Sequence, residues 1–232
     1  MIPNPREFFP LYTRLLETDM NGFGGDVVPF FCQAGSRYRE SVPRILFVGK
    51  SVNGWVTSGR TVEELFDPRN PDRIVNRSDQ MEWVKDLEGS QGYNTKKSAF
   101  WRTAKGVASA LFGEAAWYQH VAWTNLYKVS PIVGNPSLSL RKRQLETCRT
   151  ILELEIRALE PSVMVFLTSG WEAPLLERTP WENRGGHTLS WGHCQLTYAD
   201  AAGRLVIHSL HPERKPEAGH VEAILKAIRG ER

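Results

Sequence analysis

Four short apolar runs constrain the fold of this chain more than any other feature. They occupy residues 44–49, 120–127, 162–168 and 204–210. Each run is apolar at most of its positions, which is typical of strands buried on both faces of a parallel sheet. The first ends in glycine, the third leads into Ser-Gly and the fourth into His-Pro, so turn residues mark the ends of three of them. The chain is therefore expected to form a sheet whose central strands are fully buried.

Helical patterns fill the gaps between these runs. Apolar residues recur every three or four positions over residues 141–159, and Pro161 ends that pattern. Further helices are expected at residues 6–20, 98–112 and 217–228, and a shorter strand at residues 194–198. Strands that alternate with helices predict a three-layer α/β fold with a mainly parallel central sheet and right-handed crossovers. No linker composition interrupts the pattern, so we expect a single domain over residues 1–232.

The composition is ordinary for a globular protein and slightly basic. The 232 residues include 29 Lys or Arg and 26 Asp or Glu, a net charge of +3. This charge permits a nucleic-acid partner without requiring one. No apolar run is long enough to span a bilayer, the first residues do not resemble a secretory signal, and the three cysteines fit neither a disulfide framework nor a metal site. We therefore expect a cytoplasmic monomer without membrane association, metal or cofactor.

The predicted topology also names the position of a ligand site. In open α/β sheets, ligands bind in the crevice beyond the carboxyl ends of the parallel strands. Four segments follow those ends and are expected to converge there, at residues 49–55, 125–131, 168–171 and 208–216. Residues 49–55 are either a loop whose glycines let the backbone approach a ligand or only a turn between a strand and a helix.

Familiar catalytic motifs are missing, so single residues carry the chemistry. The chain has no GxxxxGK[ST] loop, no GxGxxG turn and no GxSxG elbow. Asn125 interrupts an apolar run, where its amide either bonds to backbone or reads the edge of an amide-bearing ring such as uracil. His211 can donate a hydrogen bond to a developing oxyanion, whereas His208 is expected to be a core histidine. The eight tryptophans form either a core or surfaces on which rings stack.

Three motifs occur in a fixed order along the chain: Val-Pro-Arg-Ile-Leu-Phe-Val-Gly-Lys-Ser at residues 42–51, Val-Ala-Trp-Thr-Asn at residues 121–125 and Ile-His-Ser-Leu-His-Pro at residues 207–212. With these motifs, residues 42–228 resemble the uracil-DNA glycosylase superfamily. The motifs are similar to the family's first strand and water-activating loop, to its second strand and to its closing motif. The resemblance implies that Asn125 reads a flipped base and that His211 binds an oxygen of that base.

The chain departs from the family pattern in its first loop. Where the family has an Asp, Asn or Glu that positions the attacking water, this chain has Lys50 and Ser51, and an ammonium group has no acceptor. Asn53 is the nearest substitute and is therefore the candidate water activator. Only Cys148 of the four cysteines of the cluster-binding branch is kept, so we expect no iron–sulfur cluster. Glu-Arg-Lys at residues 213–215 replaces the segment that carries the family's leucine wedge.

The resemblance implies a divergent glycosylase that hydrolyses the N-glycosidic bond of uracil or another deaminated base. Because the wedge is missing, single-stranded or loosened DNA is the expected partner. Trp55 or Phe66 would stack on the base. The phosphate contacts would come from Lys50, Ser51, Lys128, Arg214 and Lys215. The alternatives are a protein of the same fold that binds a nucleobase or nucleic acid without cleaving it, and an unrelated small-molecule α/β enzyme.

Overall fold

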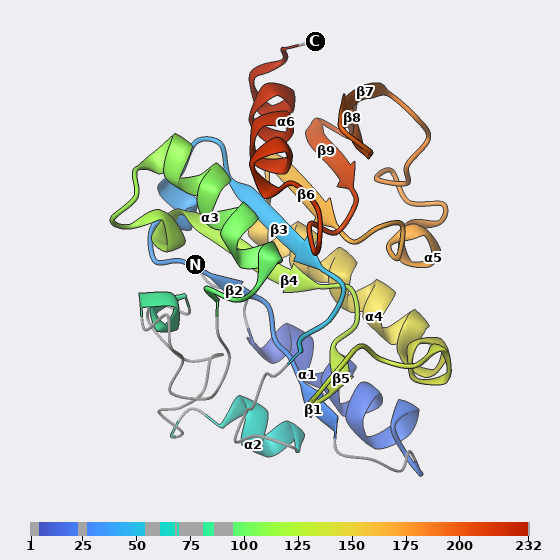
Figure 1. Cartoon of the computed structure of the whole chain (residues 1–232). Helices are drawn as coiled ribbons and strands as arrows, with labels where there is room; N and C mark the ends of the chain where they lie inside the picture. Colours follow the sequence, from blue (N-terminus) through green and yellow to red (C-terminus); the bar gives the residue numbers. More distant parts are fainter. Residues whose placement is uncertain are drawn as a thin grey trace.

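A seven-stranded sheet runs through the protein (Figure 1). The computed structural model describes residues 5–22, 27–53, 61–67, 69, 81–85 and 95–231. The strand order in the sheet is β2-β4-β3-β6-β9-β8-β7. These strands are β2 (Gln33–Ala34), β3 (Ile45–Gly49), β4 (Val121–Asn125), β6 (Val163–Leu167), β7 (His187–Trp191), β8 (Cys194–Ala201) and β9 (Arg204–Ser209). A separate antiparallel pair is formed by β1 (Val27–Pro29) and β5 (Val129–Pro131).

The four apolar runs form the parallel centre of the sheet. β3 pairs in parallel with β4 and β6, and β6 pairs in parallel with β9. The pairs β2–β4, β9–β8 and β8–β7 are antiparallel. The last two follow from tight hairpins at residues 202–203 and 192–193, which can join only antiparallel strands. The sheet is therefore mixed, and the prediction of a mainly parallel sheet describes only its four central strands.

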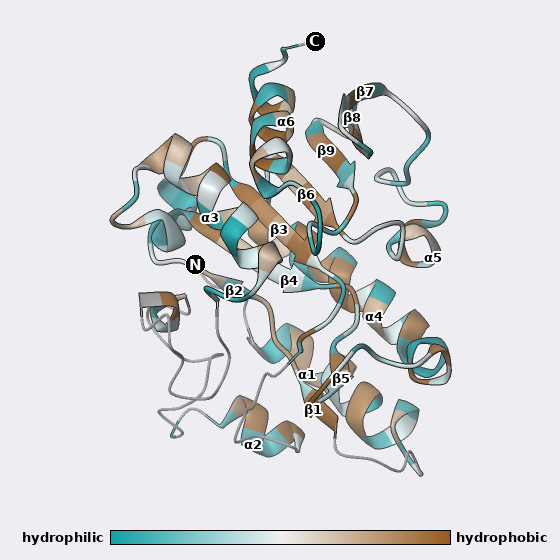
Figure 2. Ribbon diagram, viewed as in Figure 1, coloured by the Kyte–Doolittle hydropathy of each residue, from teal (hydrophilic) through white to brown (hydrophobic). Residues whose placement is uncertain are grey.

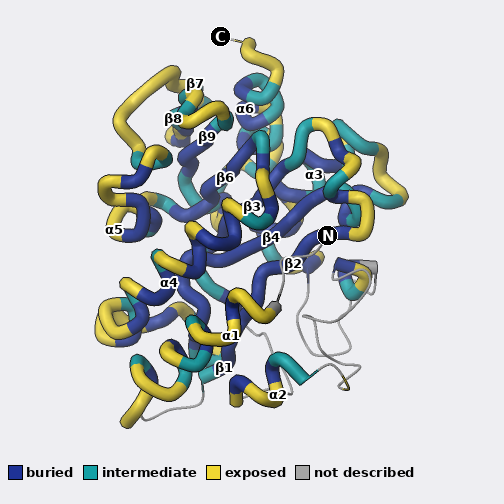
Figure 3. The backbone as a smooth tube through the Cα atoms, turned by 180° about the vertical axis from the view of Figure 1, so that it is seen from behind, coloured by how far each residue is buried: buried dark blue, intermediate teal, exposed yellow. Residues whose placement is uncertain are grey.

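Helices pack on both faces of this sheet. α1 (Pro5–Thr13) and α4 (Leu138–Leu159) bury apolar side chains together with Leu46 and Val48 of β3. α3 (Ala99–Phe112) and α6 (Glu217–Arg229) do so with Ile45 and Phe47, which alternate to the opposite face. In Figure 2 the central strands β3 and β6 have the brown of hydrophobic residues, and in Figure 3 they have the dark blue of buried ones. Both faces of the central strands are thus covered by helices.

Capping residues set the helix boundaries. Ser98 Oγ accepts a hydrogen bond from the Trp101 N–H at the start of α3, and Ser137 Oγ accepts one from the Leu140 N–H at the start of α4. The Ser137 cap lets α4 begin before residue 141, where the apolar pattern alone begins. The helix expected at residues 6–20 is α1 followed by a π-helical segment, Arg14–Asp19.

Shorter elements complete the described chain. α2 (Val62–Phe66) and α5 (Ala173–Leu176) are short helices, and the 3₁₀ turns are Tyr38–Glu40, Glu82–Lys85 and Trp117–His120. Several tryptophans belong to the core: the ring centroids of Trp101 and Trp123 are 4.7 Å apart, and Trp83 lies 5.4 Å from Trp101. Among the described helices, none combines the length and the apolar character needed to cross a membrane.

Candidate functional site

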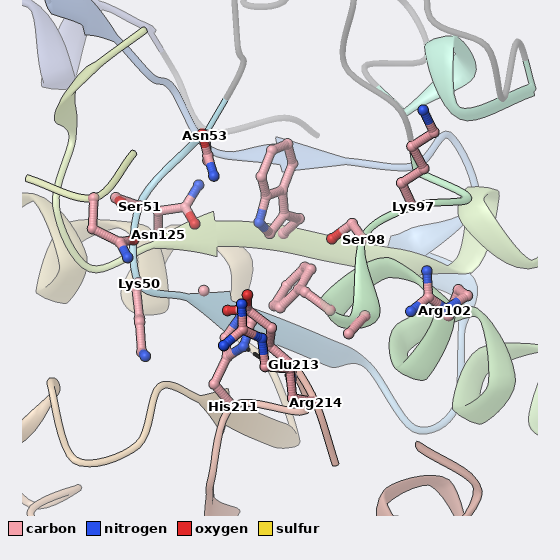
Figure 4. Close-up of a pocket in the computed structure, with 15 residues that line it drawn as sticks. Lys50, Ser51, Asn53, Lys97, Ser98, Arg102, Asn125, His211, Glu213 and Arg214 are labelled. Atoms are coloured by element: carbon pink, nitrogen blue, oxygen red, sulfur yellow. Dashed lines mark hydrogen bonds between the residues drawn. The ribbon is translucent and has the colours of Figure 1, made fainter. Parts of the chain in front are cut away.

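A polar pocket of about 530 Å³ opens beyond the carboxyl ends of β3 and β4 (Figure 4). It is lined by residues that follow β3, by Asn125 at the end of β4, by the first turn of α3 and by the loop after β9. A smaller pocket of about 240 Å³ shares Lys50 and His211 with it and adds Ser169, which follows β6. Each of the four segments that the sequence analysis expected to converge therefore contributes residues to these two neighbouring pockets.

Asn125 forms one wall of the pocket and depends on a glycine opposite it. The residue is 1% exposed and pairs in register with Gly49 of β3. A Cβ atom added to Gly49 would lie 2.4 Å from Asn125 Oδ1, so only glycine leaves room for the amide. The amide nitrogen Nδ2 is buried and has no hydrogen-bond partner among the residues that the structure describes. Such a group is suited to bind an acceptor on a ligand.

Lys128 supports Asn125 from behind and does not reach the pocket. Its Nζ donates hydrogen bonds to the Asn125 carbonyl at 2.5 Å, to Thr124 Oγ1 at 2.7 Å and to Glu155 Oε2 of α4 at 2.7 Å. Both charged side chains are fully buried. Burial raises the pKa of Glu155, and the Lys128 ammonium opposes that rise. The prediction that Lys128 contacts phosphates is wrong, because its side chain is fully buried and pairs with Glu155. The sequence does not show this pairing.

His211 lies across the pocket in a defined protonation state. Its backbone N–H donates to Ser169 Oγ at 2.7 Å, and its ring Nδ1 accepts from the Glu213 N–H at 3.2 Å. Burial, aided by the nearby Lys50 ammonium, lowers the pKa of His211 to about 4. The ring is therefore neutral at pH 7, and because Nδ1 accepts, its proton is on Nε2. That nitrogen is left as a neutral hydrogen-bond donor.

His208 is a core histidine, as expected. It is 8% exposed, its ring stacks on Phe166 with centroids 5.2 Å apart, and its Nδ1 lies 3.0 Å from Glu172 Oε1. The hydrogen bond from His208 helps to lower the pKa of Glu172 against the opposing effect of burial. This pair lies outside the larger pocket.

Cations surround the pocket and its smaller neighbour. Lys50 and Arg214 line both, and Lys215 lines the smaller one. Lys50 Nζ lies 5.0 Å from the centroid of the Trp171 ring, and burial lowers the pKa of this lysine. Ser51 also lines the larger pocket, and its Oγ is buried without a partner among the described residues.

Two further cations were missed by the sequence reasoning. Lys97 and Arg102 line the pocket from the start of α3, and Arg102 Nε also donates to Glu217 Oε2 at 2.8 Å. They were not selected because the sequence does not show which side chains at the start of α3 point into the pocket.

Asn53 lies at the rim of the pocket with its amide oxygen engaged. Its Oδ1 accepts a hydrogen bond from the Gly134 N–H at 2.9 Å, and the residue is exposed. In Figure 4, Asn53 and Asn125 lie on the side of the pocket opposite His211. The hydrogen bond to Gly134 ties the loop after β3 to the loop after β5, which is one role for Asn53 that the sequence did not reveal.

Two aromatic residues of the described chain line the pocket, Phe100 of α3 and Trp123 of β4, and the sequence reasoning selected neither as a surface for stacking. Phe100 lines the pocket, and its ring Cε2 would lie 3.4 Å from a Cβ atom at Gly49. Phe66, which was expected to stack on a base, does not line this pocket. It is partly buried and packs against Phe9, Tyr12 and Phe31 at the edge of the core, with centroids 5.5 to 5.7 Å away. Trp55, the other aromatic named, lies outside the described residues.

Comparisons with protein-family models and with curated proteins gave no match.

Within the described part of the chain, no cluster of three or more His, Cys, Asp or Glu side chains is arranged to hold a metal ion. Cys32, Cys148 and Cys194 are buried free thiols.

Proposed function

We propose that this protein is a DNA base-excision glycosylase that hydrolyses the N-glycosidic bond of uracil or another deaminated base. One observation carries the proposal: Asn125 and His211, which are far apart in the sequence, line the same pocket. One offers an unpartnered buried amide and the other a neutral imidazole with a proton on Nε2. These are the two groups that a flipped pyrimidine needs, one for its edge and one for its oxygen.

The chemistry assigned to each residue follows from these positions. Asn125 would bind the polar edge of the base, and the ring of Phe100 would supply an apolar surface beside it. As the glycosidic bond breaks, its electron pair moves onto the base, and negative charge gathers on the base oxygen. His211 Nε2–H would donate to that oxygen without first having to lose or gain a proton. Asn53 is proposed to orient the attacking water with its remaining acceptor position.

The architecture supports the glycosylase resemblance that the sequence suggests. The four central strands are parallel, and helices cover both faces, as a three-layer α/β/α fold requires. The pocket lies at the carboxyl ends of these strands, where open α/β sheets bind ligands. Of the antiparallel edge strands, β8 and β7 lie beyond β9, whereas β2 pairs with β4. No residue of these three strands lines the pocket.

DNA is proposed as the partner because of the charges at the pocket mouth. Lys50, Arg214 and Lys215 are suited to hold the phosphates that flank a flipped nucleotide, and Lys97 and Arg102 extend this positive surface. Single-stranded DNA is favoured because the loop after His211 carries polar residues where the family carries its wedge. Without a wedge, the energy of unstacking a base is lowest in single strands.

The proposal is tested by incubating the full-length protein with single-stranded oligonucleotides that carry uracil, hypoxanthine or xanthine. We expect abasic sites on at least one of them, detected by alkaline cleavage, and none on a thymine control. The His211→Ala variant serves as the matched negative, because a contaminating glycosylase would remain active in that preparation. Absence of cleavage on all three substrates with the wild-type protein would refute the proposal.

A second function is favoured by one specific observation. Residues 49–55 of the first loop include no Asp or Glu that could activate water. The Lys50 ammonium has no acceptor, and Asn53 Oδ1 already accepts a hydrogen bond from the Gly134 N–H. A protein with such a loop can bind a nucleobase or a nucleic-acid strand without cleaving it. Tight binding of a uracil-containing strand together with no excision on any deaminated base would support this second function over the first.

A further inference from the structure

Glycoside hydrolysis requires a group that takes a proton from the attacking water, and the groups considered so far are unsuited to it. The Lys50 ammonium has only donors. Asn53 has an amide, which accepts a hydrogen bond but does not take up a proton near neutral pH. The Nδ1 atom of His211 accepts the Glu213 N–H, and its Nε2 carries the proton needed by the leaving base.

Glu213 is the one carboxylate among the described residues that line the pocket. Figure 4 shows it beside His211 and Arg214, across the pocket from Asn53 and Asn125. Within the described part of the chain, nothing donates a hydrogen bond to its carboxylate and no cation pairs with it within 4.0 Å. The carboxylate therefore retains all its acceptor positions for a water molecule.

The turn that follows His211 holds Glu213 in this position. The Glu213 N–H donates to His211 Nδ1 at 3.2 Å, and Lys215 Nζ donates to the Glu213 carbonyl at 3.2 Å. The Lys215 N–H closes the turn by donating to the Pro212 carbonyl at 3.0 Å, and Arg214 adopts a left-handed φ of 58°. The same turn thus orients the donor for the base and presents the carboxylate to the pocket.

We infer that Glu213 is the general base of the reaction, an inference that rests on the proposed glycosylase function. The oxygen of a water molecule bonds to C1′ of the sugar, and one of its protons goes to the Glu213 carboxylate. The bond between C1′ and the base nitrogen breaks, and its electron pair goes to the base, whose oxygen accepts a hydrogen bond from His211 Nε2–H. The base then takes a proton from solvent and Glu213 releases its proton to solvent, leaving a free base and an abasic sugar.

The test measures single-turnover excision and binding separately. Glu213→Gln is compared with the wild-type protein on the single-stranded deaminated substrate that the wild-type protein cleaves best. Binding is measured with an oligonucleotide that carries 2′-fluoro-2′-deoxyuridine, whose glycosidic bond resists cleavage. The matched control is Glu222→Gln on α6, which removes a carboxylate that pairs with Lys226 at 3.0 Å and does not line the pocket.

We expect Glu213→Gln to slow excision by about 10²-fold or more. Its affinity for the resistant oligonucleotide should be unchanged or higher, since a negative charge has been removed near Lys50 and Arg214. Glu222→Gln should keep the wild-type rate. We also expect sodium formate to restore part of the rate of Glu213→Ala, because formate can occupy the vacated space and accept the proton.

The possible failures are distinguishable. Wild-type excision that is equally fast in Glu213→Gln would overturn the role of Glu213 and leave the glycosylase function standing. Equal losses of rate and of affinity, without rescue by formate, would identify Glu213 as a structural residue of the turn and also overturn its role as base. A wild-type protein that cleaves none of the deaminated bases would overturn both the proposed function and this inference.

Discussion

The amide of Asn125 occupies the space in which any side chain at Gly49 would begin. A Cβ atom at Gly49 would lie 2.4 Å from Asn125 Oδ1 and 3.4 Å from the Phe100 ring. The two residues pair across parallel strands, so neither can move far without disturbing the register of β3 and β4. This relationship makes Gly49 a means of displacing Asn125 without removing it.

We predict that Gly49→Ala slows excision by about 10²-fold, because a displacement of roughly 1 Å at a catalytic geometry has an effect of that size. The Asn125→Ala variant should catalyse excision at least as slowly as Gly49→Ala. It should fold normally, because Lys128 bonds to the Asn125 backbone rather than to its side chain. In a double-mutant cycle on single-turnover rates, the double variant should be much less impaired than the product of the two single fold-losses in rate. Fully additive losses would mean that Gly49 does not act through Asn125.

His211→Ala should reduce excision by about 10²- to 10³-fold, the usual effect of removing one donor to a developing oxyanion. Asn53→Ala should have a smaller effect, because its Oδ1 is already bonded to Gly134 and its amide cannot take up a proton. Single-turnover rates of the two variants on the same single-stranded substrate make the comparison. A larger loss of excision rate in Asn53→Ala than in His211→Ala would indicate that Asn53, in the first loop, activates the water.

The buried state of His211 predicts a pH dependence of stability. Burial lowers its pKa from 6.5 to about 4, so between these values the unfolded chain binds a proton that the folded protein does not. The free energy of unfolding should therefore fall as the pH falls below about 6.5, by at most about 2 kcal/mol at pH 5. Urea unfolding of the wild type and of His211→Gln at pH 7 and pH 5 measures this, and the variant should lose less stability.

Lys215→Ala should weaken binding to single-stranded DNA and reduce its salt dependence. Removing one phosphate contact lowers the magnitude of the slope of log K against log salt by about 0.7. Arg178→Ala is the control, since Arg178 is 91% exposed in its side chain and lines neither neighbouring pocket. An identical slope for wild type and Lys215→Ala would exclude a phosphate contact at Lys215.

Lys128→Met should be strongly destabilising, by about 3–5 kcal/mol, because it leaves the Glu155 charge buried without its partner. The double variant with Glu155→Gln should recover a large part of that loss, since the uncompensated charge is then gone. Urea unfolding at pH 7 measures both. A single variant as stable as the wild type would show that no uncompensated charge stays buried in the variant, and would contradict this prediction.

The parallel centre of the fold could be predicted from the sequence because each buried strand is apolar at most of its positions. Residues 45–49 and 163–167 are examples, and each ends within a residue or two of its expected boundary. The edge strand predicted at residues 194–198 is confirmed as β8, which extends to Ala201. The outermost strand β7 was not predicted, because its residues are half-buried or exposed and carry little apolar signal. Pairing at a sheet edge depends on hairpin geometry more than on hydrophobicity.

The candidate site was predicted in position and only partly in detail. Asn125 and His211 follow directly from the ends of β4 and β9, so topology alone brings them near one another. Phe100 and Glu213 could not be selected, because their approach to the pocket depends on how α3 and the turn after Pro212 pack. Lys128 was misassigned for the opposite reason: it lies in a pocket-forming segment, yet its side chain turns inward to Glu155.

The tie between Lys128 and Glu155 has a consequence for how the pocket discriminates among ligands. It fastens the strand end that carries Asn125 to α4, through a chain of hydrogen bonds with no exposed member. We expect a wall anchored in this way to have little freedom to adapt its shape to a ligand. If the proposed function holds, rings of the wrong outline should be rejected by steric exclusion, with little contribution from induced fit.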